Sequence, residues 1–93
     1  MSAIDALMQT AEQAAVKLPP PADRARLRKA QKLTQAQVAQ GIGVSVASVS
    51  AWETPGRWEP RGPVRELYAE LLRRIAARLG ESTDWEETNN EQP

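Results

Sequence analysis

Apolar residues recur at three- and four-residue intervals over several stretches of the chain, with polar residues between them. This spacing places apolar side chains on one face of a helix and predicts an all-α protein. The first stretch predicts an amphipathic helix over residues 3–18, with Ser2 as its N-cap. Residues 19–21 are all proline, which ends this helix and predicts a stiff, extended spacer. Good helix formers then predict a second helix over residues 22–32.

A pair of short helices is predicted next. Thr34 and Gln37 have the spacing of a capping box, which starts a helix. Gly43 suits the left-handed residue that ends it, and Ser45 suits the N-cap of a second helix running to Glu53. Two helices joined by so short a turn have helix-turn-helix geometry, in which the second helix can enter the major groove of DNA.

The rest of the chain divides into a loop, a long helix and a tail. Residues 54–62 contain two prolines and two glycines, which predict a loop. A continuous apolar stripe predicts a helix over residues 63–79 that starts at Pro63. Polar, acidic composition predicts disorder after it. The expected organisation is an N-terminal helix and spacer over residues 1–21, a helix-turn-helix domain over residues 22–80 and a disordered tail over residues 81–93.

Composition excludes most catalytic functions. The 93 residues include no Cys and no His, so the chain lacks thiolate nucleophiles, the usual zinc ligands and the usual general base. We therefore expect no enzyme, no metal and no cofactor. No apolar run approaches the roughly 18 residues that span a bilayer, and the N-terminus lacks a signal-peptide pattern. These observations predict a cytoplasmic protein without a membrane partner.

Charge is distributed unevenly along the chain. The formal net charge is zero, but residues 1–21 carry −1, residues 22–79 carry +6 and residues 80–93 carry −5. The basic segment coincides with the predicted helix-turn-helix. This coincidence favours binding to a phosphate backbone, which requires cations.

Residues 24–53 resemble the helix-turn-helix of the Cro and phage-repressor type, the XRE family of bacterial and phage transcriptional regulators. The resemblance is carried by Arg28, Leu33-Thr34-Gln35, Val38-Ala39, Gly43-Val44-Ser45, Val49-Ser50 and Trp52-Glu53. It implies a small helix-turn-helix bundle of the phage-repressor type, here with an extra N-terminal amphipathic helix and a long C-terminal helix. Arg24 departs from the family, which commonly has an apolar residue at this position.

Several residues of this unit are expected to serve the fold. The predicted core comprises Leu27, Leu33, Val38, Ala39, Ile42, Val49 and Trp52. The resemblance implies that Arg28 and Glu53 form a partly buried ion pair between the first and third helices of the unit. Trp58 either caps the core or contacts the sugar–phosphate backbone through its N–H. Tyr68 is expected to pack on the long helix with its hydroxyl at the surface.

The candidate DNA-binding residues lie on and around the second helix of the pair. On this helix they are Ser45, Val46, Ala47, Ser48, Ser50 and Ala51. None is Arg, Asn or Gln, so we expect readout through thymine methyl groups, hydroxyl groups and DNA shape rather than bidentate base contacts. The resemblance assigns a phosphate contact and a bracing role to Gln35. Further phosphate contacts are expected from Arg57, Arg61, Lys29 or Lys32, with a solvated surface charge as the alternative for each.

Two functions stay open. The first is a sequence-specific, double-stranded-DNA-binding transcriptional repressor that acts as a homodimer, because one small unit buries too little surface for tight binding. Its dimer element is either the helix over residues 3–18 or that over residues 63–79. The second is a protein-interaction module, such as an antitoxin or phage regulatory factor, with secondary DNA binding. Its partner would bind the N-terminal helix or the acidic tail, which alternatively masks the basic surface or merely solubilises the chain.

Overall fold

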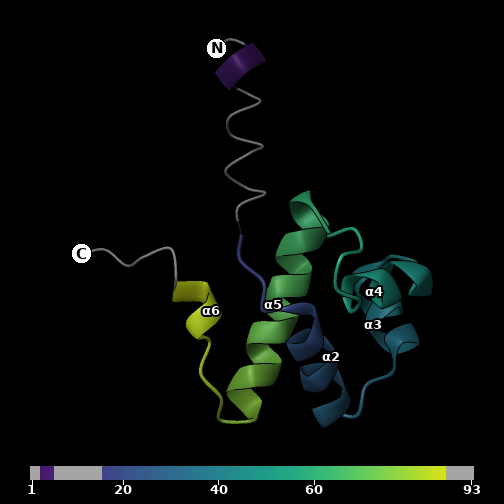
Figure 1. Ribbon diagram of the computed structural model, residues 1–93, viewed down its shortest axis with the longest axis vertical. Coiled ribbons are helices and arrows are strands. Elements are labelled where there is room, and N and C mark those ends of the chain that lie inside the picture. Colours follow the sequence, from purple (N-terminus) through teal and green to yellow (C-terminus); the bar gives the residue numbers. More distant parts are fainter. Residues whose placement is uncertain (1–2, 6–15, 88–93) are drawn as a thin grey trace.

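The computed structural model of the chain describes residues 3–5 and 16–87. Over these residues the helices are residues 3–5, α2 (Pro21–Ala30), α3 (Gln35–Ile42), α4 (Val46–Trp52), α5 (Gly62–Arg78) and α6 (Asp84–Glu87). The described part contains no strand, so the predicted all-α fold is confirmed. Figure 1 shows α5 in the middle of the molecule with α2 beside it, α3 and α4 on one side, and α6 on the other.

The helix-turn-helix begins and ends at the residues that the sequence predicts. The Thr34 hydroxyl accepts a hydrogen bond from the Gln37 backbone N–H (3.0 Å), and the Gln37 side chain accepts one from the Thr34 N–H (2.8 Å). Gly43 ends α3 with a left-handed φ of 93°. The Ser45 hydroxyl caps α4 by accepting from the Ser48 N–H at 3.1 Å. Local capping chemistry therefore accounts for α3, the turn and α4.

Trp52 lies at the centre of the core. Its ring centroid is 4.8 Å from that of Tyr68, and both residues are almost completely buried. The buried cluster comprises Leu27, Val38, Ala39, Val49, Trp52, Tyr68, Leu72, Ile75 and Ala76. Of the seven predicted core residues, only Leu33 and Ile42 fall outside this cluster, and both pack against it partly buried. The helix-turn-helix and the long helix α5 thus share one hydrophobic core.

The expectation for Tyr68 is wrong. Its hydroxyl is buried together with the ring and has no hydrogen-bond partner in the described part of the chain. Burial raises the pKa of this phenol, because the charged form is disfavoured away from water. With the whole residue only 1% exposed, the hydroxyl does not reach the surface.

The N-terminal segment differs from its prediction at the end that meets the bundle. Residues 16–18 are not helical, although a helix was expected to continue to residue 18. A residue that precedes proline is disfavoured from helical geometry, which explains an earlier end. Pro21 is already the first residue of α2 rather than part of the predicted spacer, Pro19 is fully buried, and Leu18 packs against the core. Most of the predicted helix, residues 6–15, lies outside the described residues.

The beginning of the acidic tail is folded, which corrects the prediction of disorder for residues 81–87. Glu81 accepts two hydrogen bonds from the Arg26 guanidinium, at 2.9 and 3.0 Å, and Trp85 packs against the core. An aromatic side chain and an ion pair thus attach α6 to the bundle. Residues on both sides of the domain expected over residues 22–80 therefore contact it. Residues 88–93 lie outside the described part.

Candidate nucleic-acid interface

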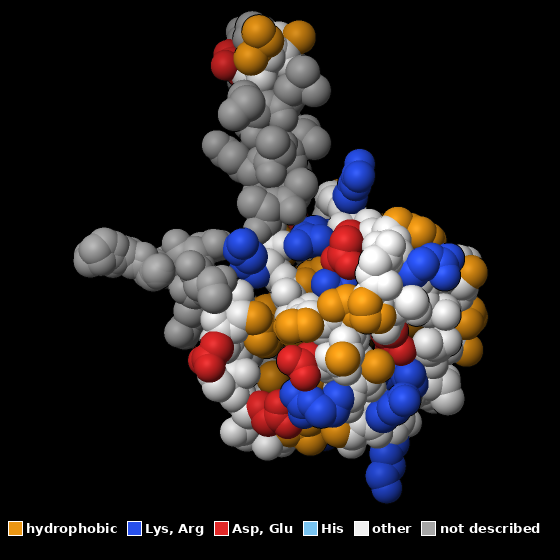
Figure 2. All heavy atoms as spheres, viewed as in Figure 1, with side chains coloured by type: hydrophobic (Ala, Val, Ile, Leu, Met, Phe, Trp, Pro, Cys, Tyr) orange, Lys and Arg blue, Asp and Glu red, His pale blue; other side chains and the backbone are white. Residues whose placement is uncertain are grey.

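One face of α4 is open to solvent. Val46 is 47% exposed, and Ala47 and Ser50 are exposed as well. Ser48 is half-buried, and its hydroxyl lies 2.9 Å from that of the capping residue Ser45. Figure 2 shows apolar and basic side chains gathered along the side of the molecule where α3 and α4 lie. Small apolar and hydroxyl side chains thus form a surface that could approach base edges closely.

Ala51 is wrongly predicted as a DNA-facing residue, because it is only 2% exposed. It occupies the last turn of α4, where the chain turns back at once: the Thr54 N–H donates to the Ala51 carbonyl at 3.1 Å. The methyl group of Ala51 therefore does not reach solvent. The exposed surface of α4 is consequently narrower than expected.

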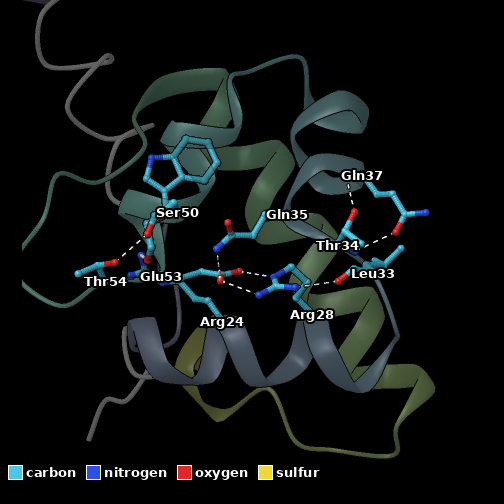
Figure 3. Close-up of polar contacts among 10 residues, drawn as sticks. Arg24, Arg28, Leu33, Thr34, Gln35, Gln37, Ser50, Glu53 and Thr54 are labelled. Atoms are coloured by element: carbon cyan, nitrogen blue, oxygen red, sulfur yellow. Dashed lines mark hydrogen bonds and ion pairs between the residues drawn. The ribbon is translucent and has the colours of Figure 1, made fainter.

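Arg28 and Glu53 form the ion pair that the resemblance implies. Arg28 donates to both carboxylate oxygens, at 2.7 and 3.0 Å, and its Nη1 donates to the Leu33 carbonyl at 2.9 Å (Figure 3). The Glu53 side chain is only 6% exposed. The hydrogen bonds to this carboxylate raise the pKa of Arg28. The pair therefore connects α2 to the end of α4 and lies inside the fold.

Gln35 belongs to the same network. Its side-chain Nε2 donates to Glu53 Oε1 at 3.0 Å, so the first residue of α3 contacts the residue that ends α4 (Figure 3). This contact matches the bracing role expected for Gln35. Its phosphate contact stays a prediction.

Arg24 has a structural role that sequence reasoning missed. It is 4% exposed and donates to the Pro19 carbonyl (2.7 Å), to the Trp52 carbonyl (2.8 Å) and to both oxygens of Glu59 (3.1 and 2.8 Å). One signal was available, since Arg24 and Arg28 are four residues apart and lie on the same face of a helix. Arg28 and Arg24 thus bind consecutive residues at the end of α4, Glu53 and Trp52.

The loop after α4 carries the two predicted arginines, Arg57 and Arg61. Both are exposed and form no ion pair within the described residues. Arg61 lies beside α4, because it lines a hollow of about 440 Å³ together with Ser48 and Trp58. Trp58 contacts Trp52 edge-on at 6.3 Å but stays 52% exposed. It therefore covers the core only in part and presents the rest of its indole to the same hollow.

Two further cations, Lys29 and Lys32, are exposed at and just beyond the end of α2. By contrast, the acidic residue Glu81 lies against Arg26 and lines a different hollow, between α2 and α6. The described part of the tail is therefore bound to α2, and it does not cover α4.

A helix-turn-helix family model matches residues 25–54, which is about a third of the chain. The match covers most of α2, all of α3 and all of α4. The resemblance to XRE-type regulators is thereby confirmed over these residues, and it supports a DNA-binding regulator of transcription. Neither a curated protein nor a solved structure matches the chain. Across the described residues, every helix is too short or too polar to cross a membrane.

Proposed function

Since residues 25–54 form a helix-turn-helix, we propose that the protein is a sequence-specific repressor that binds double-stranded DNA as a homodimer. The observation that carries this proposal is the open face of α4, where Val46, Ala47 and Ser50 are exposed. Arg61 lies beside α4 and forms no ion pair within the described residues. A helix with small side chains can lie deep in the major groove, and adjacent cations can contact phosphates.

The chemistry of this face sets the kind of readout. Val46 and Ala47 offer apolar contacts for thymine methyl groups, and Ser50 offers one hydroxyl. Phosphate contacts come from Arg57 and Arg61 and supply most of the affinity. Base preference is accordingly weaker than for a helix with bidentate side chains, and DNA shape contributes to the choice of site.

A homodimer is supported by the outer face of α5. Leu67 is 53% exposed and lines a hollow of about 390 Å³ with Ile42, Leu71 and the charged residues Glu70 and Arg74. An apolar face bordered by both signs of charge suits a second copy of the same surface. Sedimentation of the full chain tests this part: we expect a dimer, and Leu67→Lys is expected to weaken it. A monomer at all concentrations would contradict the dimer but leave DNA binding by one unit open.

The DNA-binding part is tested by selecting bound sequences from random duplex DNA and then measuring affinity against salt concentration. We expect Arg57→Gln and Arg61→Gln each to weaken binding to all sequences and to lower the salt slope by about 1. Arg78→Gln, which removes an exposed cation at the far end of α5, is the matched control and is expected to change little. Absence of any binding at low salt would contradict the proposal.

Repression is tested separately by transcription in vitro from a promoter that overlaps a selected site. Adding the protein is expected to lower transcript yield. An increase would indicate activation instead and would leave the DNA-binding part of the proposal intact.

A further inference from the structure

Glu59 lies between two arginines from different helices. Arg24 of α2 donates to both of its carboxylate oxygens, and Arg65 Nη1 of α5 lies 3.8 Å from Oε1. Arg65 also donates to the Pro60 carbonyl, at 3.2 Å. Two helices that do not belong to the α3–α4 pair therefore bind the loop at Glu59 and at the residue after it.

The same two arginines bind the N-terminal segment. Arg24 Nε donates to the Pro19 carbonyl at 2.7 Å, and Arg65 Nε donates to the Val16 carbonyl at 2.5 Å. Arg24 is almost completely buried, and burial lowers the pKa of Arg65 despite the nearby Glu59 carboxylate. These guanidinium groups, one from α2 and one from α5, thus join residues 16–19 to the end of α4 and the loop that follows it.

We propose that Glu59 is a positioning residue: its contacts with Arg24 and Arg65 hold the loop of residues 54–61 beside α4, so that Arg57 and Arg61 face the DNA backbone. The inference rests on the proposed function, because it assigns the loop to phosphate contacts. It concerns a contact outside the matched residues 25–54.

The charge of Glu59 supports a positioning role. Its side chain is 41% exposed, in the same loop as the two cations assigned to phosphates. A carboxylate there repels DNA unless its contacts within the protein compensate. The neighbours of Glu59 in the chain are Trp58, which contacts Trp52 edge-on, and the buried Pro60. Fixing Glu59 therefore orients the residues on both sides of it.

Glu59→Gln and Glu66→Gln form a matched pair for the test. Each removes one carboxylate, but Glu66 is exposed on α5 and forms no ion pair within the described residues. By charge alone, both changes should strengthen DNA binding. If Glu59 positions the loop, Glu59→Gln instead weakens binding about fivefold or more and lowers the salt slope by about 1 to 2, as expected when one or two phosphate contacts are lost. Glu66→Gln keeps the slope of the unmodified protein.

Two further measurements separate positioning from a general loss of stability. Amide hydrogen exchange without DNA is expected to be faster at residues 54–61 in Glu59→Gln, and unchanged in α3 and α4. In an Arg57→Gln, Arg61→Gln background, Glu59→Gln is expected to add little further loss of affinity, because the contacts that it positions are already absent.

The outcomes distinguish the inference from the proposed function. If the unmodified protein binds no DNA, the proposed function fails, while hydrogen exchange still reports whether Glu59 fixes the loop. Equal or tighter DNA binding by Glu59→Gln, or weaker binding with unchanged exchange at residues 54–61, would overturn the positioning role.

Discussion

The two faces of α2 present arginines to different kinds of partner. Arg24 and Arg28 point to the buried end of α4, where they bind the Trp52 carbonyl and the Glu53 carboxylate. Arg26, between them in the chain, lies on the exposed side and pairs with Glu81 of the tail. The comparison shows that one helix can bind its neighbours through the same residue type in each case. The contribution of each contact to the free energy of unfolding depends on how deeply that contact is buried.

Arg24 and Arg28 also differ from each other. The partner of Arg28 is almost completely buried, with a 6% exposed side chain, whereas Glu59, the partner of Arg24, is 41% exposed. Removing Arg28 leaves the Glu53 carboxylate inside the protein without an opposite charge, although Gln35 still donates to it. Removing Arg24 leaves two carbonyl groups without their donor and a carboxylate that water can solvate. The first loss is therefore expected to cost more than the second.

Arg28→Ala tests the most costly contact. We expect it to lower the free energy of unfolding by about 3–5 kcal/mol, because the Glu53 charge stays buried without its partner. Urea denaturation of the full chain measures this. Replacing both Arg28 and Glu53 by Leu is expected to cost less than Arg28→Ala alone, and the reverse order would contradict the role of the buried charge.

Arg24→Leu tests the second contact by placing an apolar side chain at this position. We expect a loss of about 1–3 kcal/mol, since the Pro19 and Trp52 carbonyls lose their donor. The same denaturation experiment checks the value. A loss of unfolding free energy larger than that of Arg28→Ala would contradict the expectation that the Arg28–Glu53 pair contributes more than the contacts of Arg24.

Two matched substitutions test how closely the end of α4 is enclosed. Ala51→Leu is expected to cost about 1–3 kcal/mol by overpacking, whereas Ala47→Leu on the exposed face is expected to change stability by about 0.5 kcal/mol or less. Thermal and urea unfolding of the two variants give the comparison. Equal effects would show that the side chain of Ala51 is not enclosed.

The exposed ion pair of Arg26 and Glu81, on the other face of α2, is expected to have the smallest effect on the free energy of unfolding. The hydrogen bonds that Glu81 accepts from Arg26 lower the pKa of Glu81 in the folded protein. The resulting stabilisation is therefore present above the unfolded pKa of Glu81 and is lost as the pH falls through the folded value. The difference in unfolding free energy between the unmodified protein and Glu81→Gln should be small at neutral pH and should vanish in acid. A difference that persists at acid pH would point to another cause.

Local signals in the sequence predicted a large part of the fold. The capping residues of α3 and α4, the left-handed Gly43 and the apolar stripe of α5 act over a few residues, so their consequences can be derived without tertiary structure. α2 and α5 each begin within one residue of the predicted start.

The missed features depend on contacts between distant segments. The burial of Arg24 involves Glu59 and Pro19, and the folding of residues 81–87 involves Arg26 and the core. Composition alone does not indicate which acidic residue will meet a specific arginine. The DNA-facing residues stay predictions for a related reason, because exposure marks a free surface without identifying what binds it.

The central claim is that the open face of α4 and the loop after it bind DNA. An NMR titration of the labelled full chain with duplex DNA tests it most directly, because backbone amide shifts report contacts residue by residue. We predict that the largest shifts occur at residues 45–50 and 57–61, and that residues around Arg26 and in α6 change little. Shifts concentrated around Arg26, Glu81 and α6, with α4 unchanged, would contradict the account.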